Sequence, residues 1–253
     1  MSLQREPRLL FIDIEVLPNT GTFWDRYPQG GIIPWENITQ ERTILCVAWK
    51  WQGAARVRSI GSSNGDDYKI CQKVLKLWKS ADAIAGHCSD KYDLRWLKGR
   101  MAIHGLGPPP PVVQIDTKKI AQKHLNLNSY SLGYLAHLAK IGEKIPTEYA
   151  MWQRCMSPDP KVRARALKPM IRYCKHDVEL LEGVYSWLRA YDQERKLNRA
   201  LFSSDPDRTC SSCGEQSLIQ WGFFSTRAGI QRRLFCKACH SWSRRPMGSG
   251  VPR

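Results

Sequence analysis

Residues 8–18 read Arg8-Leu9-Leu10-Phe11-Ile12-Asp13-Ile14-Glu15-Val16-Leu17-Pro18, so two carboxylates lie one residue apart in a largely aliphatic run. The apolar content and the proline that ends the run indicate a β-strand. Side chains alternate between the faces of a strand, so Asp13 and Glu15 share one face and the other face is wholly apolar. Half-buried carboxylates at this spacing repel each other unless a cation lies between them. The run therefore indicates a divalent metal site.

Taken alone, an Asp-x-Glu pair is more often a surface strand whose carboxylates face water. Two later acidic residues change that preference. Asp93 follows a predicted strand and lies in the first turn of a predicted helix, where a capping or dipole role is the ordinary interpretation. Asp177 lies in a later predicted helix, four residues after Tyr173, so the two side chains share a face beside an apolar stripe. A simple hydrogen-bonded pair of Tyr173 and Asp177 is the alternative.

The three motifs occur in the order Asp-x-Glu on a first strand, His-x4-Tyr-Asp at a strand-to-helix turn, and Tyr-x3-Asp on a late helix. This order resembles the tyrosine subclass of the DEDD superfamily of 3′-to-5′ exonucleases. Within that subclass, the chain is most similar to stand-alone relatives of the exonuclease domain of family B DNA polymerases. The resemblance covers roughly residues 8–189, and three ordered motifs are far more specific than any one of them. It implies a ribonuclease-H-like fold.

The resemblance also implies roles for five residues. Asp13, Glu15 and Asp177 would ligate a metal that activates water, and Asp13 would bridge to a second metal. Asp93 would hold the second metal through water. Tyr173 would orient the attacking water, because a phenol with a pKa near 10 is a poor base at neutral pH. Two Mg²⁺ or Mn²⁺ ions suit a site made only of carboxylates.

Three neighbouring residues need separate interpretations. Cys88 stands where relatives often carry Asn, a departure that bears on efficiency more than on the metal site. His176 is not the histidine of the sister subclass, because that motif needs a histidine five residues before Asp177, where Arg172 stands. Asp116 is expected to cap a helix.

The predicted elements place these motifs in a mixed sheet. Strand-like runs with short turn-rich connections, which favour antiparallel pairing, follow the first strand at residues 21–27, 44–51 and 55–60. Further strands are expected at 83–86 and 112–115. Helices are expected at 67–81, from Ser89 or Asp90 to about His104, at 117–123, 131–139 and 147–154, and from 159 to about 198, with Pro169 dividing the last one. The sequence thus predicts an α/β fold with a ribonuclease-H-like mixed sheet, antiparallel first and then parallel, flanked by helices.

Four cysteines form two Cys-x2-Cys pairs, Cys210 with Cys213 and Cys236 with Cys239. Pairs at this spacing close a tetrahedral site and resemble a zinc ribbon, and Gly214 allows the positive φ of the first turn. With all four positions filled by cysteine, one structural Zn²⁺ is expected. Two disulfides are the alternative interpretation. The expected units are a nuclease domain at 1–197, a linker at 198–208, the ribbon at 209–245 and a tail at 246–253.

The composition indicates a polyanionic partner, because the formal net charge is +16 and the pI is about 9.6. Residues 200–253 hold eight Lys or Arg against three Asp or Glu, interleaved with aromatic residues. Nucleic acid, DNA rather than RNA, is the expected partner. For the ribbon, a merely solvated basic surface and a site for a protein partner stay open as alternatives. No apolar run is long enough to span a membrane or form a signal peptide, so a cytoplasmic location is expected.

The sequence therefore predicts a two-metal-dependent 3′-to-5′ exonuclease that acts on single-stranded DNA, with the ribbon aiding substrate or partner binding. Two alternatives stay open. One is a catalytically weak adaptor that binds nucleic acid on the same scaffold, which the departure at Cys88 supports. The other is a structure-specific endonuclease on the same fold.

Overall fold

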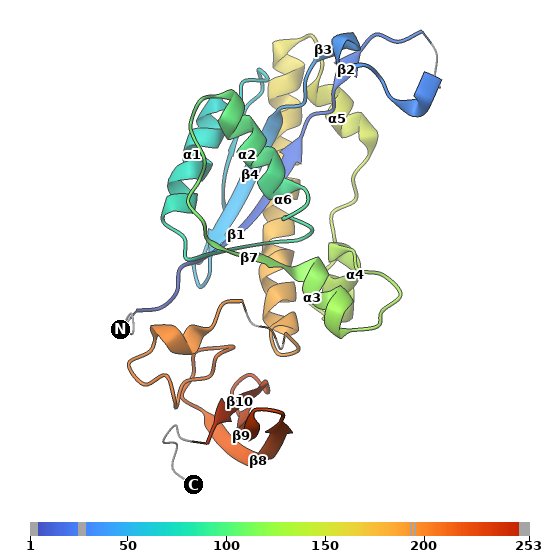
Figure 1. Ribbon diagram of the computed structural model, residues 1–253. Coiled ribbons are helices and arrows are strands. Elements are labelled where there is room, and N and C mark those ends of the chain that lie inside the picture. The colour runs from blue at the N-terminus through green and yellow to red at the C-terminus, as the bar shows by residue number, and fades with distance from the viewer. Residues whose placement is uncertain (1–4, 25–28, 193, 195, 248–253) are drawn as a thin grey trace.

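The computed structural model describes residues 5–24, 29–192, 194 and 196–247, and its centre is a five-stranded sheet with the strand order β5-β4-β1-β6-β7 (Figure 1). The strands are β1 Leu9–Val16, β4 Ile44–Trp51, β5 Arg58–Gly61, β6 Ala83–Gly86 and β7 Val113–Asp116. β1 pairs antiparallel with β4, and β4 with β5, whereas β1, β6 and β7 run parallel. The predicted mixed α/β sheet, antiparallel first and then parallel, is confirmed.

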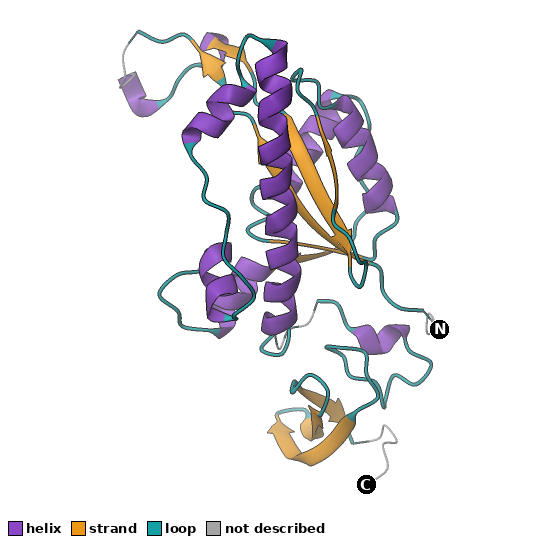
Figure 2. Ribbon diagram, turned by 180° about the vertical axis from the view of Figure 1, so that it is seen from behind, coloured by secondary structure: helices purple, strands orange, loops and turns teal. Residues whose placement is uncertain are grey.

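Helices cover both faces of this sheet (Figures 1 and 2). On one face, α1 Tyr68–Lys79 and α2 Asp93–Ile103 pack against the apolar side of β1, which presents Leu10, Ile12, Ile14 and Val16. On the other face, α6 Pro160–Leu188 crosses β1 and β4. The helices α3 Thr117–His124, α4 Leu132–Leu138 and α5 Tyr149–Cys155 pack beside α6. The acidic face of β1 is therefore the face that α6 covers.

The helix α6 is continuous over 29 residues, with Pro169 in its interior. The predicted division at Pro169 is wrong, because buried Ala166 and Met170 flank the proline and pack into the core on both sides of it. The predicted end near residue 198 is also wrong. The helix ends at Leu188, where its buried apolar stripe ends.

Two local predictions need correction. The expected strand at 21–27 is reduced to a short hairpin of β2 Thr20–Gly21 and β3 Ile38–Gln40, and residues 25–27 lie outside the described residues. Short 3₁₀ turns, Gln29–Gly31 and Trp35–Asn37, lie between those two strands. Ser89 or Asp90 was expected to cap α2, but residues 89–92 form a turn and the N-cap position is Tyr92. Asp93 lies in the first turn of that helix, as expected.

The C-terminal part contains a 3₁₀ helix, η3 Arg199–Phe202, and a three-stranded antiparallel sheet of β8 Leu218–Thr226, β9 Gly229–Cys236 and β10 Trp242–Pro246. It contacts the end of α6, where the Ser212 hydroxyl donates a hydrogen bond to the Arg189 carbonyl at 3.2 Å. The stretch expected to be a linker includes Arg199, which is buried. Of the predicted tail, residues 248–253 lie outside the described residues. Among the described helices, none has the length and apolar character needed to cross a bilayer.

Candidate active site

Three of the expected acidic residues converge between β1 and α6. Asp13 and Glu15 project from one face of β1, and Asp177 projects from the facing side of α6. One carboxylate oxygen from each of the three lies within 4.8 Å of the others. The two carboxylates that the alternation places on one face of β1 thus lie next to a carboxylate from a helix that begins well over a hundred residues later.

Burial makes this cluster electrostatically costly. Asp13 Oδ2 and Asp177 Oδ1 are buried, and no described residue donates a hydrogen bond to either atom. Burial, together with repulsion by neighbouring carboxylates, raises the pKa of Asp13 well above its ordinary value and that of Glu15 to about 8. Unpaired buried oxygens at this spacing are suited to a hard divalent cation such as Mg²⁺ or Mn²⁺, which takes oxygen ligands. The donor set therefore fits the metal that the sequence motifs indicate.

Asp93 lies beside this trio in the first turn of α2. The parallel pairing of β1 with β6 ends at Phe11, and further along β1 the amide of Ile14 donates a hydrogen bond to Asp93 Oδ1 at 3.2 Å. Burial raises the pKa of Asp93 to about 7, and its charge contributes to the raised pKa of Asp13. Asp93 is close enough to Asp13 to repel it, but it is outside the group of three oxygens described above.

Tyr173 precedes Asp177 by one turn of α6, and both contact a lysine that sequence reasoning missed. Lys144 Nζ lies 2.9 Å from Asp177 Oδ2 and 5.0 Å from the centre of the Tyr173 ring. Burial alone would lower the pKa of Lys144, but its hydrogen bonds to Tyr173 and Asp177 outweigh that cost and raise it. Burial raises the pKa of Tyr173 to about 12, so the phenol is protonated at neutral pH.

His87 and Cys88 hold the turn that leads to Asp93. The ring nitrogens of His87 lie 2.9 Å from Thr117 Oγ1 and 2.9 Å from the Tyr130 carbonyl, and burial lowers its pKa to about 4. Cys88 has a φ of 62°, and its amide donates to Asp116 Oδ1 at 2.9 Å. Asparagine enters this left-handed region more readily than most residues. Asp116 caps α3, as expected.

The raised pKa values predict how stability depends on pH and metal. An acid whose pKa is raised by folding stabilises the folded state fully below its ordinary pKa, and this contribution is lost as the pH rises through the raised value. For Glu15 the window runs from 4.5 to about 8. Without divalent metal, the melting temperature should decrease as the pH is raised from 5.5 to 8.5. Added Mn²⁺ should raise the melting temperature more at pH 8.5 than at pH 5.5. Differential scanning calorimetry at both pH values measures this.

The matched control for that experiment is the double variant Asp13→Asn, Glu15→Gln. It lacks two of the repelling charges, so its melting temperature should depend less on pH and respond less to Mn²⁺. Equal pH dependence and equal metal response in both proteins would contradict the assignment of these carboxylates.

The four expected cysteines form a second cluster. One sulfur from each of Cys210, Cys213, Cys236 and Cys239 lies within 4.8 Å of the others, and all four are free thiols. The Sγ–Sγ distances are 3.8 Å for Cys210 with Cys239 and 3.7 Å for Cys213 with Cys236. A tetrahedron with Zn–S bonds of about 2.3 Å has edges of about 3.8 Å. The geometry is consistent with a structural zinc, and none of the four cysteines is in a disulfide, whose S–S bond would be about 2.0 Å.

The two turns that carry these cysteines have matching geometry. Gly214, with a φ of 89°, donates its amide to the Cys210 carbonyl at 3.0 Å. His240, with a φ of 59°, donates its amide to the Cys236 carbonyl at 2.9 Å. The positive φ expected at Gly214 is present, and its counterpart at a non-glycine residue was not visible in the sequence.

The Cys236→Ser variant is expected to lose its zinc. The purified protein should bind about one zinc per chain, and the variant close to none, because serine is a poor ligand for Zn²⁺ beside thiolates. A chelator assay after thiol modification measures the metal, and Cys88→Ser, outside the cluster, is the matched control. The response of the carboxylate trio to Mn²⁺ should survive in Cys236→Ser, because the trio lies on β1 and α6. Unchanged zinc content in this variant would contradict the assignment of the four cysteines as zinc ligands.

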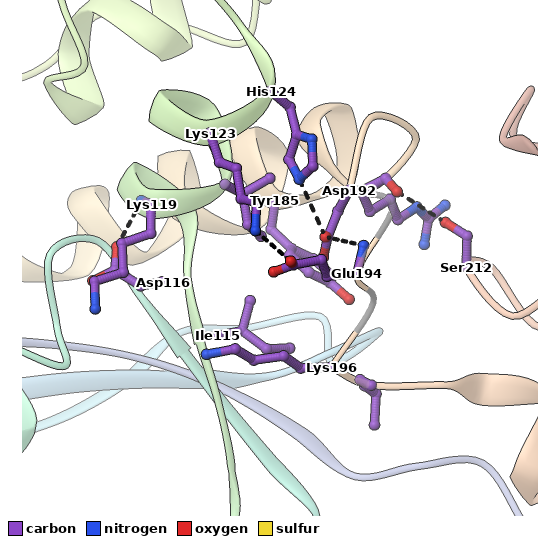
Figure 3. A pocket seen from close by; sticks show the side chains of 13 residues that line it. Ile115, Asp116, Lys119, Lys123, His124, Tyr185, Asp192, Glu194, Lys196 and Ser212 are labelled. Carbon is purple, nitrogen blue, oxygen red and sulfur yellow. Dashed lines mark hydrogen bonds and ion pairs between the residues drawn. The ribbon is translucent and has the colours of Figure 1, made fainter. Parts of the chain in front are cut away.

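A pocket of about 260 Å³ lies elsewhere, between α3, β7 and the end of α6 (Figure 3). Its lining is basic, but ion pairs neutralise much of it. Lys119 pairs with Asp90, Lys123 pairs with Glu194, and His124 Nε2 lies 3.7 Å from Asp192 Oδ1. The trio of carboxylates does not line this pocket, so it is separate from the candidate active site.

No family model matches the chain, and no curated protein matches it. Among solved structures, it is similar to the family B DNA polymerase from the hyperthermophilic archaeon Pyrobaculum calidifontis, with a TM-score of 0.54 and 15% sequence identity. The match covers 78% of this chain and 27% of the polymerase chain, so this protein corresponds to about a quarter of that polymerase's length. The likeness shows that the chain shares its fold with part of a family B DNA polymerase.

Proposed function

We propose that the protein is a two-metal-dependent 3′-to-5′ exonuclease that hydrolyses phosphodiester bonds in single-stranded DNA. The observation that carries the proposal is the convergence of Asp13, Glu15 and Asp177, whose buried oxygens lie within 4.8 Å and include atoms without a hydrogen-bond donor. Asp93 lies beside them. The shared fold with part of a DNA polymerase and the net charge of +16 support a nucleic-acid substrate.

The chain's own residues have distinct roles in this proposal. Asp13, Glu15 and Asp177 would hold one divalent ion, and Asp93 with Asp13 would hold the second. Bound Mg²⁺ or Mn²⁺ supplies an acidified water and charge neutralisation at the phosphate. Tyr173 orients the attacking water, because a phenol with a pKa near 12 keeps its proton at neutral pH.

Lys144 is an addition to the set expected from sequence. Its ammonium contacts both Tyr173 and Asp177, so it holds the phenol and the carboxylate in fixed positions relative to each other. It also places a positive charge beside the carboxylates, where a phosphate group would approach. Both effects favour an ordered arrangement before the substrate arrives.

We assign these roles to a nuclease domain of residues 1–197, joined by residues 198–208 to a zinc ribbon of residues 209–245. In this assignment the ribbon helps to hold the substrate. The structured sheet continues to Pro246, one residue past the proposed boundary.

The test uses a single-stranded oligonucleotide labelled at its 5′ end and incubated with Mg²⁺ or Mn²⁺. The expected product is a ladder that shortens from the 3′ end and disappears with Asp13→Ala. Equal degradation by Asp13→Ala would refute the proposal, and so would internal cleavage of a circular single strand, which indicates an endonuclease. Matched RNA and hybrid substrates establish which polynucleotide is preferred.

A further inference from the structure

One face of the C-terminal sheet gathers aromatic side chains. Residues paired across antiparallel strands point to the same face. Trp242 pairs with Phe235, and Phe224 pairs with Gln231, two positions along β9 from Arg233, so these side chains share a face. Trp221 joins them, because its ring centre lies 6.1 Å from that of Phe235 and 6.0 Å from that of Trp242. Trp221, Phe224 and Trp242 are 56%, 40% and 43% exposed.

Two arginines lie among these rings. Arg233 and Arg244 are cross-strand partners, so both project from the aromatic face. The Arg233 guanidinium lies 5.4 Å from the Trp242 ring centre, and its Nε donates to the Trp221 carbonyl at 2.8 Å. The Arg244 guanidinium lies 4.4 Å from the Phe224 ring centre. The cations are thus held against the rings and keep further donors for a ligand.

The opposite face of the same sheet faces the zinc site. Leu234, Cys236 and Arg232 alternate with the residues of the aromatic face along β9, and all three are buried. The face that carries Leu234 and Cys236 therefore forms the small core, whereas the aromatic face is exposed to solvent. Figure 1 shows this sheet at the foot of the molecule, beyond the end of α6.

The charge of this sheet has one sign. Residues 218–246 contain no Asp or Glu, and their basic residues are Arg227, Arg232, Arg233, Lys237, Arg244 and Arg245. A groove of about 920 Å³ borders the aromatic face. It is lined by Phe224, Trp242, Arg233 and Arg244 and by residues of the 198–211 stretch, including Asp207, whose carboxylate pairs with Arg245 at 3.2 Å. A ligand here meets flat apolar rings and positive charge together.

We propose that this aromatic face binds an unpaired polynucleotide, with bases stacked on Trp221, Phe224 and Trp242 and phosphates bound by Arg233 and Arg244. Exposed rings interleaved with arginines suit unpaired bases, because every base offers a flat face and every nucleotide a negative charge. A duplex hides its base faces, so it is disfavoured. The inference deepens the proposed function by placing part of the substrate strand on the ribbon, but binding at this face requires no cleavage.

The test measures binding without catalysis. The full-length, zinc-loaded protein carries Asp13→Ala and is titrated into fluorescein-labelled oligo(dT) without added Mg²⁺ or Mn²⁺, and anisotropy reports the affinity. Adding Phe224→Ala should weaken binding about tenfold, as expected for loss of one stacked base. The matched control is Phe223→Ala, which changes the adjacent residue. Phe223 is 56% exposed and pairs with buried Arg232, so it lies on the other face.

Three further measurements decide the outcome. Arg244→Gln should reduce by about one the slope of log affinity against log salt. Oligo(U) should bind comparably, which supports stacking independent of the sugar, and a blunt duplex should bind more weakly. Zinc content and melting temperature confirm that each variant is folded. If folded Phe224→Ala binds oligo(dT) as tightly as Phe223→Ala does, the inference is overturned, and the face is instead available to a protein partner. The assay measures binding and not cleavage. Its result can therefore be interpreted even if the protein proves to have no nuclease activity.

Discussion

In the exonuclease proposed above, Asp177→Asn is expected to lower the rate of nucleotide release by more than about 100-fold. Loss of a group that only supports a metal ligand typically costs about 10- to 100-fold, so loss of a ligand should cost more. Asparagine keeps the shape of the side chain but removes the negative charge that pairs with Lys144 and that would bind the proposed metal. Initial rates on a labelled single strand at saturating Mn²⁺ measure the effect.

The matched control for this variant is Glu179→Gln, which removes an exposed carboxylate two residues away on the same helix. Its rate should stay within about twofold of the parent protein, because an exposed charge interacts weakly through water. The fold should survive in Asp177→Asn, since the substitution relieves repulsion among the three carboxylates and Lys144 can reach solvent. Parent-like activity in Asp177→Asn would remove this residue from the site.

Asp67→Asn is expected to reduce the free energy of unfolding by about 3–5 kcal/mol, the usual loss when one partner of a buried ion pair is removed. Asp67 is fully buried and accepts hydrogen bonds from Arg100 Nε at 2.8 Å, from Arg100 Nη2 at 3.0 Å and from the Ile44 amide at 2.8 Å. His104 Nε2 lies 2.5 Å from Asp67 Oδ1, the oxygen that also accepts from Arg100 Nη2. Asparagine would leave the buried positive charge of Arg100 without a compensating negative charge.

Urea titration of Asp67→Asn, with the exposed neighbour Asp66→Asn as the matched control, measures this loss. The control should differ from the parent by less than about 0.5 kcal/mol. Burial by itself would raise the pKa of Asp67, but hydrogen bonds from Arg100 and His104 outweigh burial and lower it. Its contribution is therefore present above pH 3.8 and lost as the pH falls below that value. Equal stability of the two variants would show that the ion pair is dispensable.

The double variant Asp67→Asn, Arg100→Met separates the two causes of that loss. It removes the unpaired charge together with its partner, so it should recover part of the stability that Asp67→Asn loses. A double variant less stable than Asp67→Asn would indicate that packing of the Arg100 side chain, rather than its charge, matters most.

Local patterns made much of the fold and candidate site predictable. The alternation in residues 9–16 depends only on backbone geometry, and it correctly predicted which side chains of β1 face the apolar core. The strands at 44–51 and 83–86 have the expected bounds. The Cys-x2-Cys spacing likewise reflects a local turn, and the four thiols meet as expected.

Features that depend on contacts between distant segments were not predictable. Lys144 comes from the loop between α4 and α5, and no motif marks it, because its role exists only once that loop folds against α6. Pro169 favoured a helix break, but packing of the flanking residues outweighs the missing hydrogen bond. The partners of Asp67 lie 33 and 37 residues away, and no local pattern links them to it.

The unbroken α6 also sets the distance between the carboxylate trio and the first cysteine turn. Eleven residues separate Asp177 from Leu188, which at about 1.5 Å per residue is about 17 Å, and Ser212 of the first cysteine turn contacts the helix end directly. The helix α6 therefore holds the carboxylate trio and the first cysteine turn at a fixed separation. Under the proposed function, a strand too short to cover that distance would contact only one of the two sites, so the shortest strand that gains affinity from the ribbon would measure the distance.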